Sequence, residues 1–547
     1  MIAAVLCASL LAPGAMRPGG SAPKPSGVLV VPLDTPANDG RTYWLGEAVS
    51  ILIAEDIEAR GLDAISRQSR ERAYDQLHLP SNAVLSRATV IKVGEIVGAE
   101  RVLVGEVSVD GEALSITVQP IRLDIGRADP PVTERGDLQN LFDLARKAAR
   151  RAVPGGGEPA LAPSPSLQGF EQYVKGLLAE EPAARAEFLQ KALDLQPNYD
   201  RARIALWDVR TSQGDYQAAL AAVRGIRSDS PEARRGSFLA SVSLVQLKQY
   251  EEAFTLLQSL DGTPAEPAIL NNLGVVQIRR GASPETGKPV YFLTKAATAA
   301  PDDPDVLFNL GYAYALDRDP QGAIYWLRES LRRKPEDGDA HYVLAAALDM
   351  AGSSIEASRE RELAAQLSAH WAEARRAAAA GTRTDGVPRG LERLRQDLGA
   401  RADAVDRALA NTAQRDQEQL AQFHLDRARR LYGAEQDTDA LSELQQTVFL
   451  SPYDADAHLL IGRIYLRDGR PRDAVNALKI SIWSKDSTAA RLALAEAYLT
   501  LKDPASARTQ AQRALELDGD SMDAKAMLER IDRAGGQAPR HRIRSEV

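Results

Sequence analysis

Apolar residues recur at spacings of three and four through most of the chain, which is the pattern of helices that bury one face. The clearest stretch begins at Pro304 and ends at Pro335, with a polar turn near its middle. The final Pro lacks an N–H group and therefore ends the second helix. We expect a helical hairpin whose buried face is formed by Leu307, Leu310, Gly311, Tyr314, Ala323 and Leu327.

This hairpin repeats with a period of about 34 residues. A fixed period of this length predicts a stack of units, each of which buries its apolar surface against its neighbours. We expect one array of about six units over residues 167–367 and a second array of three units over residues 419–533. Pairs of residues that lie 34 positions apart include Tyr216 and Tyr250, Pro301 and Pro335, Gly311 and Ala345, and Ala440 and Ala474.

The residues of each unit resemble the tetratricopeptide repeat (TPR) in their order and spacing. Leu310-Gly311, Tyr314 and Ala323 stand where that family has its Leu-Gly pair, its aromatic residue and its small residue. Gly or Ala is needed where two helices touch, because a larger side chain does not fit. The resemblance implies a mainly α-helical solenoid that holds other proteins. Residues 368–418, between the arrays, are Ala- and Arg-rich and are expected to form a helical connector or degenerate repeats.

Residues 27–153 lack the period and predict a small α/β domain. Asp110-Gly111, between two alternating apolar segments, is a strong signal for a β-hairpin. A Pro- and Gly-rich linker follows over residues 154–166. The expected elements are strands over 28–33, 62–66, 101–109 and 112–123, and helices over 44–60, 88–97 and 138–153.

This domain resembles the amino-terminal domain of TolB and FlgO-type domains. The resemblance rests on Leu45-Gly46 in the first helix, on Ala64-Ile65-Ser66-Arg67, and on the run from Gly94 to Val107. Such domains stand in front of repeats in bacterial envelope proteins. The resemblance implies a non-catalytic role in an envelope assembly, although repeats take the place of the TolB propeller.

The amino terminus carries a short apolar run, Ile2–Leu11, followed by Pro, Gly and Ser residues. Residues 1–26 are expected to be a signal peptide and linker, which predicts an exported, periplasmic or envelope-associated protein. A cytoplasmic regulatory TPR protein is the alternative. No apolar stretch has the length of a membrane span. Residues 534–547 are expected to form a disordered basic tail.

The charge pattern and the scattered histidines argue against several functions. A net charge of −8 with interspersed signs provides no basic footprint for nucleic acid. The six histidines do not pair at metal-ligand spacing. Asp302, Asp303 and Asp305 are interpreted as helix caps. We therefore expect no enzyme, no cofactor and no metal, with an active site in the α/β domain as the remaining alternative.

The first helix of each TPR hairpin lines a concave surface, and the side chains between its packing positions face a ligand. We expect a groove for an extended or helical peptide of a partner protein, with Asn271 reading the peptide backbone. The Lys and Arg pattern of a carboxylate-clamp TPR is not evident. The residues expected to bind the peptide are Asn271, Val275, Ile278, Phe308, Tyr312 and Ala315.

Overall fold

The computed structural model describes residues 27–35, 42–80, 85–158, 164–262, 266–281, 287–379, 386–398 and 418–535. The expected signal peptide and most of the basic tail lie outside these ranges. The chain forms two compact units, divided after Pro197. The division thus follows the first helical hairpin rather than the linker over 154–166. Among the described residues, no helix is long and apolar enough to cross a membrane.

The first unit contains a five-stranded sheet in the order β1-β2-β3-β4, with β5 also paired to β3. β1 runs parallel to β2, and the other pairs are antiparallel. The β2–β3 hairpin turns at Gly111, which has φ +61°. The strands are β1 (Val28–Val30), β2 (Arg101–Asp110), β3 (Ala113–Arg122), β4 (Arg127–Ala128) and β5 (Val132–Asp137).

Helices cover this sheet with the apolar faces that the sequence predicts. Ile53 and Ile57 of α1 are fully buried, and on β3 the alternation places Leu114 and Ile116 in the core. Three elements were not predicted, namely α2, β4 and β5. The expected strand over 62–66 reduces to a single bridge between Val28 and Ala64. The helices are α1 (Leu45–Ala59), α2 (Arg67–Gln76), α3 (Arg87–Ile96), the 3-10 turn η1 (Leu138–Asn140) and α4 (Leu141–Ala152).

The first helical hairpin, α5 (Leu167–Leu178) and α6 (Pro182–Leu195), belongs to the same unit. Phe170 of α5 is buried, with its ring centroid 6.4 Å from that of Trp44 and 5.3 Å from that of Phe142. Aromatic rings at these separations attract one another beyond the area they bury. The linker is also anchored, because Arg60 donates hydrogen bonds to the carbonyl oxygens of Val153 and Gly155.

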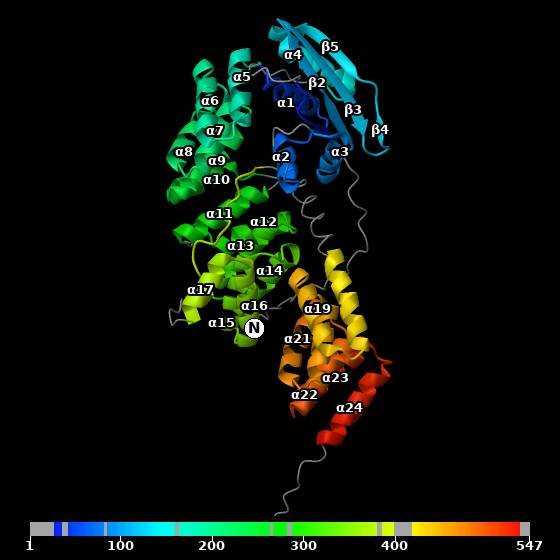
Figure 1. Cartoon of the computed structure of the whole chain (residues 1–547). Coiled ribbons are helices and arrows are strands. Elements are labelled where there is room, and N and C mark those ends of the chain that lie inside the picture. The colour runs from blue at the N-terminus through cyan, green and yellow to red at the C-terminus, as the bar shows by residue number, and fades with distance from the viewer. Residues whose placement is uncertain are drawn as a thin grey trace, which may run out of the picture. The chain divides into compact units, whose positions relative to one another are not determined.

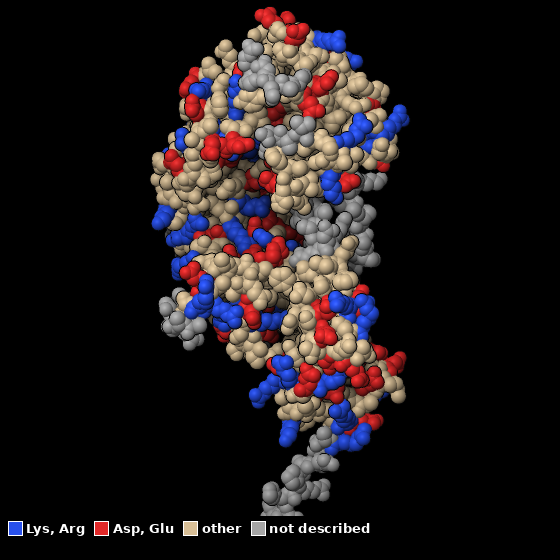
Figure 2. Space-filling view, in the orientation of Figure 1, with Lys and Arg blue, Asp and Glu red and all other residues tan. Residues whose placement is uncertain are grey.

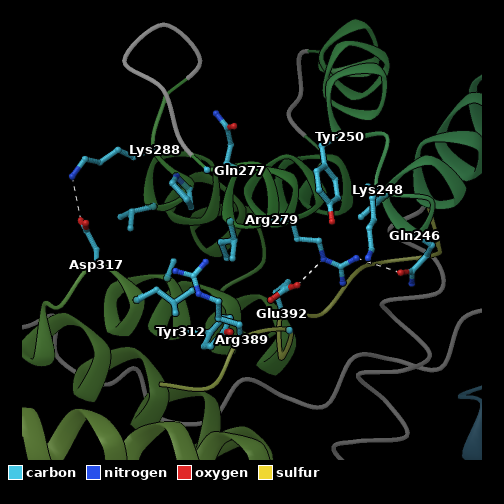
Figure 3. Close-up of a pocket in the computed structure, with 18 residues that line it drawn as sticks. Gln246, Lys248, Tyr250, Gln277, Arg279, Lys288, Tyr312, Asp317, Arg389 and Glu392 are labelled. Atoms are coloured by element: carbon cyan, nitrogen blue, oxygen red, sulfur yellow. Dashed lines mark hydrogen bonds and ion pairs between the residues drawn. The ribbon is translucent and has the colours of Figure 1, made fainter. Parts of the chain in front are cut away.

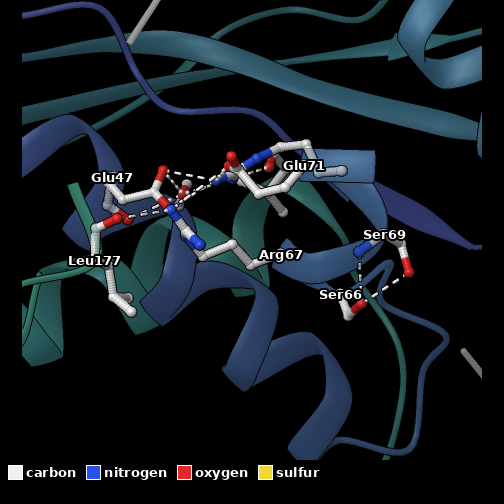
Figure 4. Close-up of polar contacts among 9 residues, drawn as sticks. Glu47, Ser66, Arg67, Ser69, Glu71 and Leu177 are labelled. Carbon is white, nitrogen blue, oxygen red and sulfur yellow. Dashed lines mark hydrogen bonds and ion pairs between the residues drawn. The ribbon is translucent and has the colours of Figure 1, made fainter. Parts of the chain in front are cut away.

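A buried ion cluster joins α1, α2 and α5 in this unit (Figure 4). Both carboxylate oxygens of Glu47 accept from Arg70, at 2.6 and 2.8 Å, and Arg67 donates to the same carboxylate at 2.5 Å. Arg67 also donates to the carbonyl oxygen of Leu177 at the end of α5. Burial alone would raise the pKa of Glu47, but the two arginines outweigh it and lower that pKa. The carboxylate is thus charged and fully paired, as in a structural cluster.

The second unit consists of helical hairpins in two arrays (Figure 1). In the first array the helices are α7 (Asp200–Ser212), α8 (Tyr216–Arg224), α9 (Ala233–Gln246), α10 (Tyr250–Leu260), α11 (Pro267–Arg280), α12 (Pro289–Ala299), α13 (Pro304–Leu316), α14 (Pro320–Arg333), α15 (Gly338–Met350), α16 (Ser354–Leu367) and α17 (Ala369–Ala379). The second array has helical residues 418–433, followed by α19 (Asp437–Leu450), α20 (Ala455–Arg467), α21 (Pro471–Ser484), α22 (Thr488–Thr500), α23 (Pro504–Leu517) and α24 (Met522–Gly535).

Close contact inside the hairpins explains the small residue of the repeat. A Cβ added at Gly311 would lie 2.7 Å from Leu327 Cγ, and one added at Gly462 would lie 2.5 Å from Leu478 Cγ. Real Cβ atoms do not approach so closely. In both arrays, the glycine of the first helix therefore leaves the space that the leucine of the second helix fills. The predicted mainly α solenoid in two arrays, with a small α/β domain in front, is confirmed.

The turn between the two helices of a hairpin also repeats. Gly352 and Gly469 occupy this turn with positive φ angles of 81° and 71°. Arg318, 34 residues before Gly352, and Lys502, 33 residues after Gly469, have φ of 60° and 62° in the same place. In this left-handed conformation a Cβ atom lies too close to the following carbonyl oxygen. The turn therefore favours Gly, and the backbones of Arg318 and Lys502 are slightly strained.

The structure describes only part of the stretch 368–418, which the sequence predicts as a helical connector or degenerate repeats. Helix α17 covers its first residues, but residues 386–398 form neither helix nor strand. Their backbone instead bonds to side chains of the first array, as described below.

Candidate peptide-binding groove

A 13-residue segment of the chain, Gly386–Leu398, runs across α11 and α13 (Figure 1). Each of these is the first helix of its hairpin in the first array. We call residues 386–398 the internal segment. Its contacts come from α11, α13 and the turns that begin α13 and α15. The surface that it covers is called the groove below. It is formed by the first helices of the repeats, the side on which the sequence predicts a ligand site.

Two asparagines hold the backbone of the internal segment. Asn309 accepts from the Arg393 N–H at 2.8 Å and donates to the Arg393 carbonyl at 2.7 Å. Asn272 makes the same pair of bonds with Arg395, both at 2.8 Å. In an extended chain the N–H and carbonyl groups of every second residue point to the same side. Each asparagine amide bonds to one such residue, as the backbone of a neighbouring β-strand would. These four bonds hold peptide groups of any sequence.

Asn271 links the two asparagine clamps. Its amide nitrogen donates to the Arg393 carbonyl at 2.9 Å and to Asn272 Oδ1 at 3.2 Å. Its own oxygen accepts from Asn309 at 2.8 Å. All three asparagines are essentially fully buried. Buried amides are costly unless they are paired, so the internal segment completes the hydrogen bonding of this network.

The Arg393 side chain makes three close contacts with the array. Its guanidinium lies 2.6 Å from Asp305 and 2.5 Å from Asp337, and it stacks 3.8 Å from the ring centroid of Phe308. Burial by itself would lower the pKa of Arg393, but Asp337 and Asp305 outweigh it and raise that pKa. A planar guanidinium between two carboxylates and an aromatic face fits this place better than an ammonium group does.

Further polar contacts fix both ends of the internal segment. Arg395 pairs with Asp303 at 3.0 Å, and Arg279 of α11 donates to the buried carboxylate of Glu392 at 2.6 Å. Toward the amino end, the Tyr312 hydroxyl donates to the Pro388 carbonyl at 2.6 Å. Burial and the charge of Glu392 raise the pKa of Tyr312 to about 12, so this hydroxyl stays a donor at neutral pH.

Apolar side chains of the internal segment continue the cores of the array. Leu394 and Leu398 pack against the cluster that includes Leu273 and Leu307. Val387 and Leu391 pack against the neighbouring cluster, which includes Phe308 and Tyr312. The segment therefore contributes to both apolar cores as well as to the hydrogen bonds with the asparagines.

A cavity of about 560 Å³ lies beside the internal segment (Figure 3). It is bounded by the ends of α9, α11 and α13, and Arg389, Gly390 and Glu392 of the segment form one of its walls. Within it, Arg279 points to Glu392, and Lys288 pairs with Asp317 at 3.2 Å. This volume is within the range of sites that hold a ligand or a large side chain.

The structure brings together several of the six residues that the sequence predicts. Asn271 and Tyr312 bond to the segment, and Phe308 stacks on Arg393. Ile278 is partly buried between the two apolar clusters and lines the cavity. Val275 and Ala315 are buried within the array. Their role in binding a partner stays a prediction.

The prediction missed Asn272, Asn309, Arg279 and the acidic helix caps as parts of the groove. A signal for the asparagines was present, since each stands two residues before the Gly of its repeat, Gly274 or Gly311. Asp303 and Asp337 cap α13 and α15, as expected for acidic residues at the repeat turns. Each also pairs with an arginine of the internal segment, which the capping interpretation did not include.

Charged side chains of both signs are interspersed on the surface, and His341 has partners inside the protein. Figure 2 shows Lys and Arg intermixed with Asp and Glu over the face in view. His341 bonds to Glu360 and to the Pro335 carbonyl inside the first array. Among the described residues, no three His, Cys, Asp or Glu side chains are placed to hold a metal ion together.

Parts of the chain match the profile of a known repeat family. Residues 205–267, 292–338 and 425–487 match the profile of the tetratricopeptide repeat. These stretches lie in both arrays, so the profile and the hairpin geometry together define them as TPR solenoids. Comparison with the curated proteins gave no match.

The comparison with solved structures matched several TPR structures over parts of this chain. The first TPR of Spaghetti (RPAP3), bound to an HSP90 peptide, is 18% identical, covers 22% of this chain and 95% of its own, and has a TM-score of 0.21. YrrB, a TPR protein with an unusual peptide-binding site, is 17% identical, with coverages of 35% and 99% and a TM-score of 0.28. The TPR domain of P58(IPK) is 16% identical, with coverages of 68% and 98% and a TM-score of 0.22.

Proposed function

We propose that this protein is a non-catalytic scaffold that holds an extended segment of a partner protein in the groove of its first array. Proteins built from TPRs generally mediate protein–protein interactions. Stacked repeats create extended concave surfaces suited to this task. In this chain the groove has the chemistry that such binding requires, which is a set of backbone clamps flanked by charged and apolar contacts.

One observation carries the proposal. Asn272 and Asn309 bond to both the N–H and the carbonyl of a residue in a chain segment, and those two residues are two positions apart. Side chains that pair with main-chain groups in this way recognise an extended peptide as such. Asp305, Asp337 and Phe308 then add a preference for arginine at one position.

Site-specific photo-crosslinking in the native host tests the proposal. A photoreactive amino acid at Ile278, on the cavity wall, should form a crosslink to a partner, whose attached peptide is then identified by mass spectrometry. The matched control is the same amino acid at Tyr325, which is 50% exposed on α14 and outside the groove. Crosslinks of equal yield and identity from both positions would overturn the proposal.

We also propose that the protein works in the bacterial cell envelope. Two features of the sequence support this location, namely the apolar run Ile2–Leu11 and the resemblance of residues 27–153 to TolB and FlgO-type domains. In this view the front domain docks on one envelope component, while the repeats hold another. Cell fractionation with amino-terminal sequencing tests the location, and an unprocessed full-length chain in the cytoplasm would contradict it.

A further inference from the structure

We infer that the internal segment is a built-in competitor, which occupies the groove until a partner segment with the same arrangement of arginine and leucine displaces it. The inference rests on the proposed function and specifies both its ligand class and its regulation. The partner is an extended, basic segment of the form Leu-x-Arg-Leu-Arg, the sequence of residues 391–395.

The bonding of the segment is that of a ligand. Residues 386–398 have no regular secondary structure of their own, and their backbone bonds to asparagine and tyrosine side chains 76 to 123 positions away in the chain. A connector needs only to reach the next array. This stretch instead meets backbone clamps, an acidic site for Arg393 and apolar contacts for Leu391 and Leu394. A peptide from another protein would use the same groups.

The charges define which partner fits. Asp303, Asp305 and Asp337, which we call the acidic edge of the groove, receive Arg393 and Arg395. An acidic partner segment would meet like charges there, and an apolar one would leave the carboxylates unpaired. Arginine two residues after the first leucine is therefore the central requirement for a partner.

The contacts are also suited to exchange. Each asparagine clamp is a pair of neutral hydrogen bonds, and the same bonds re-form with any incoming backbone. Arg279 and Glu392 form an ion pair in the wall of the cavity, and Glu392 leaves with the segment. A competing segment can thus begin at the open cavity beside Arg389 and Gly390, and replace the internal one contact by contact.

Binding of a free peptide to the full-length protein tests the inference. The probe is a fluorescent peptide with the sequence of residues 386–398, measured by anisotropy. In the variant R393D/R395D, the internal segment carries negative charges against the acidic edge and should leave the groove. The peptide should bind this variant at least tenfold more tightly than it binds the unmodified protein.

Two matched variants make the result decisive. R463D/R472D makes the same change in charge at exposed arginines of the second array, and it should bind the peptide as weakly as the unmodified protein does. Adding N272A/N309A to R393D/R395D should abolish the gain. A circular dichroism spectrum like that of the unmodified protein shows that each variant is folded.

Other results overturn the inference in distinguishable ways. Equal binding by the unmodified protein and R393D/R395D, lost with N272A/N309A, would leave the groove as a peptide site and remove the competitor. No binding by folded R393D/R395D would mean that the segment is a permanent part of the array. The proposed function would then depend on the crosslinking result alone.

Discussion

Gly311 in the first array and Gly462 in the second have the same place in their hairpins, each against a buried leucine of the partner helix. The residue two positions earlier is Asn309 in one and Leu460 in the other. Asn309 bonds to the internal segment, whereas Leu460 packs into the apolar cluster of its own array. The repeat pattern thus specifies the hairpin in both arrays, while the residue at this position holds a backbone in one array and packs into the core in the other.

Loss of the shared packing should have the largest effect in both arrays. Leu327→Ala and Leu478→Ala each remove a fully buried side chain and leave a cavity beside a glycine. Each should lower the local free energy of unfolding by about 2–5 kcal/mol. Hydrogen exchange of the amides of α13–α14 and α20–α21 measures this.

The exposed Tyr325→Ala is the control for the leucine substitutions and should change stability by less than about 0.5 kcal/mol. A large loss at one leucine with none at the other would show that the arrays are not packed by the same rule.

The second array has a leucine, Leu460, where the first array has its clamping asparagines. Placing leucine at the asparagine positions should release the internal segment. N272L/N309L removes the four asparagine hydrogen bonds to the segment, and even at about 0.5 kcal/mol each this amounts to about 2 kcal/mol. Trypsin should then cleave after Arg393 and Arg395 at least tenfold faster, because cleavage follows the population of the open state. The rate is measured by mass spectrometry of the full-length protein.

The reverse change, Leu460→Asn, serves as the matched substitution in the second array and should leave cleavage at Arg393 and Arg395 unchanged. If N272L/N309L also leaves cleavage unchanged, the asparagines do not hold the segment.

The two arrays should respond in opposite directions to acid through equivalent histidines. Burial and the nearby Arg359 and Arg328 lower the pKa of His458 to about 3, whereas the pKa of His341 is raised because Glu360 outweighs burial. A lowered histidine pKa means that stability falls as pH drops below the ordinary value of 6.5. A raised one contributes stability below 6.5, which is lost as pH rises through the folded pKa.

Between pH 7.5 and 5.5, α20 should therefore lose about 1.4 kcal/mol, at about 1.36 kcal/mol for each pH unit below the ordinary histidine pKa. Helix α15, which carries His341, should lose none. Hydrogen exchange at the two pH values, corrected for the intrinsic rates, measures this. His458→Gln should abolish the change in α20, and an equal loss in both helices would contradict the assignment.

The smallest effect is expected at the turns inside the hairpins. Lys502 has φ +62°, in the place where Gly352 and Gly469 stand in other units. Lys502→Gly should raise the stability of the second array by roughly 0.5 kcal/mol, because relief of the left-handed strain exceeds the added chain entropy. Urea denaturation followed by circular dichroism measures the change.

Lys479→Gly, inside α21, should instead lower stability by about 1 kcal/mol. A loss of stability at both lysines would show that the turn at Lys502 is not strained.

The hairpins were predictable because their pattern is local. Leu310, Gly311 and Tyr314 meet Ala323 and Leu327 within one repeat, and the spacing of helical faces places them correctly. In the front domain, the hairpin at Asp110-Gly111 followed from the alternation of apolar residues. β5 was missed because its sequence, Val132–Asp137, is mostly polar and half-exposed, so it lacks that signal.

The internal segment was not predictable in the same way. Residues 386–398 have no periodic pattern, and their partners lie as far as 123 positions away, so no local rule connects them. The sequence did indicate Asn271 and Phe308 as residues that face the groove. It could not show that a part of the same chain covers them, because that depends on how the chain returns across the first array.

The exchange rates of the Arg393 and Arg395 amide protons in the unmodified full-length protein test the central claim most directly. These two N–H groups donate to Asn309 and Asn272, and fragmentation in the mass spectrometer can assign their exchange individually. Occupation of the groove predicts that both amides exchange at least tenfold more slowly than the same residues do in the free peptide of residues 386–398. Exchange at the rate of the free peptide would contradict it.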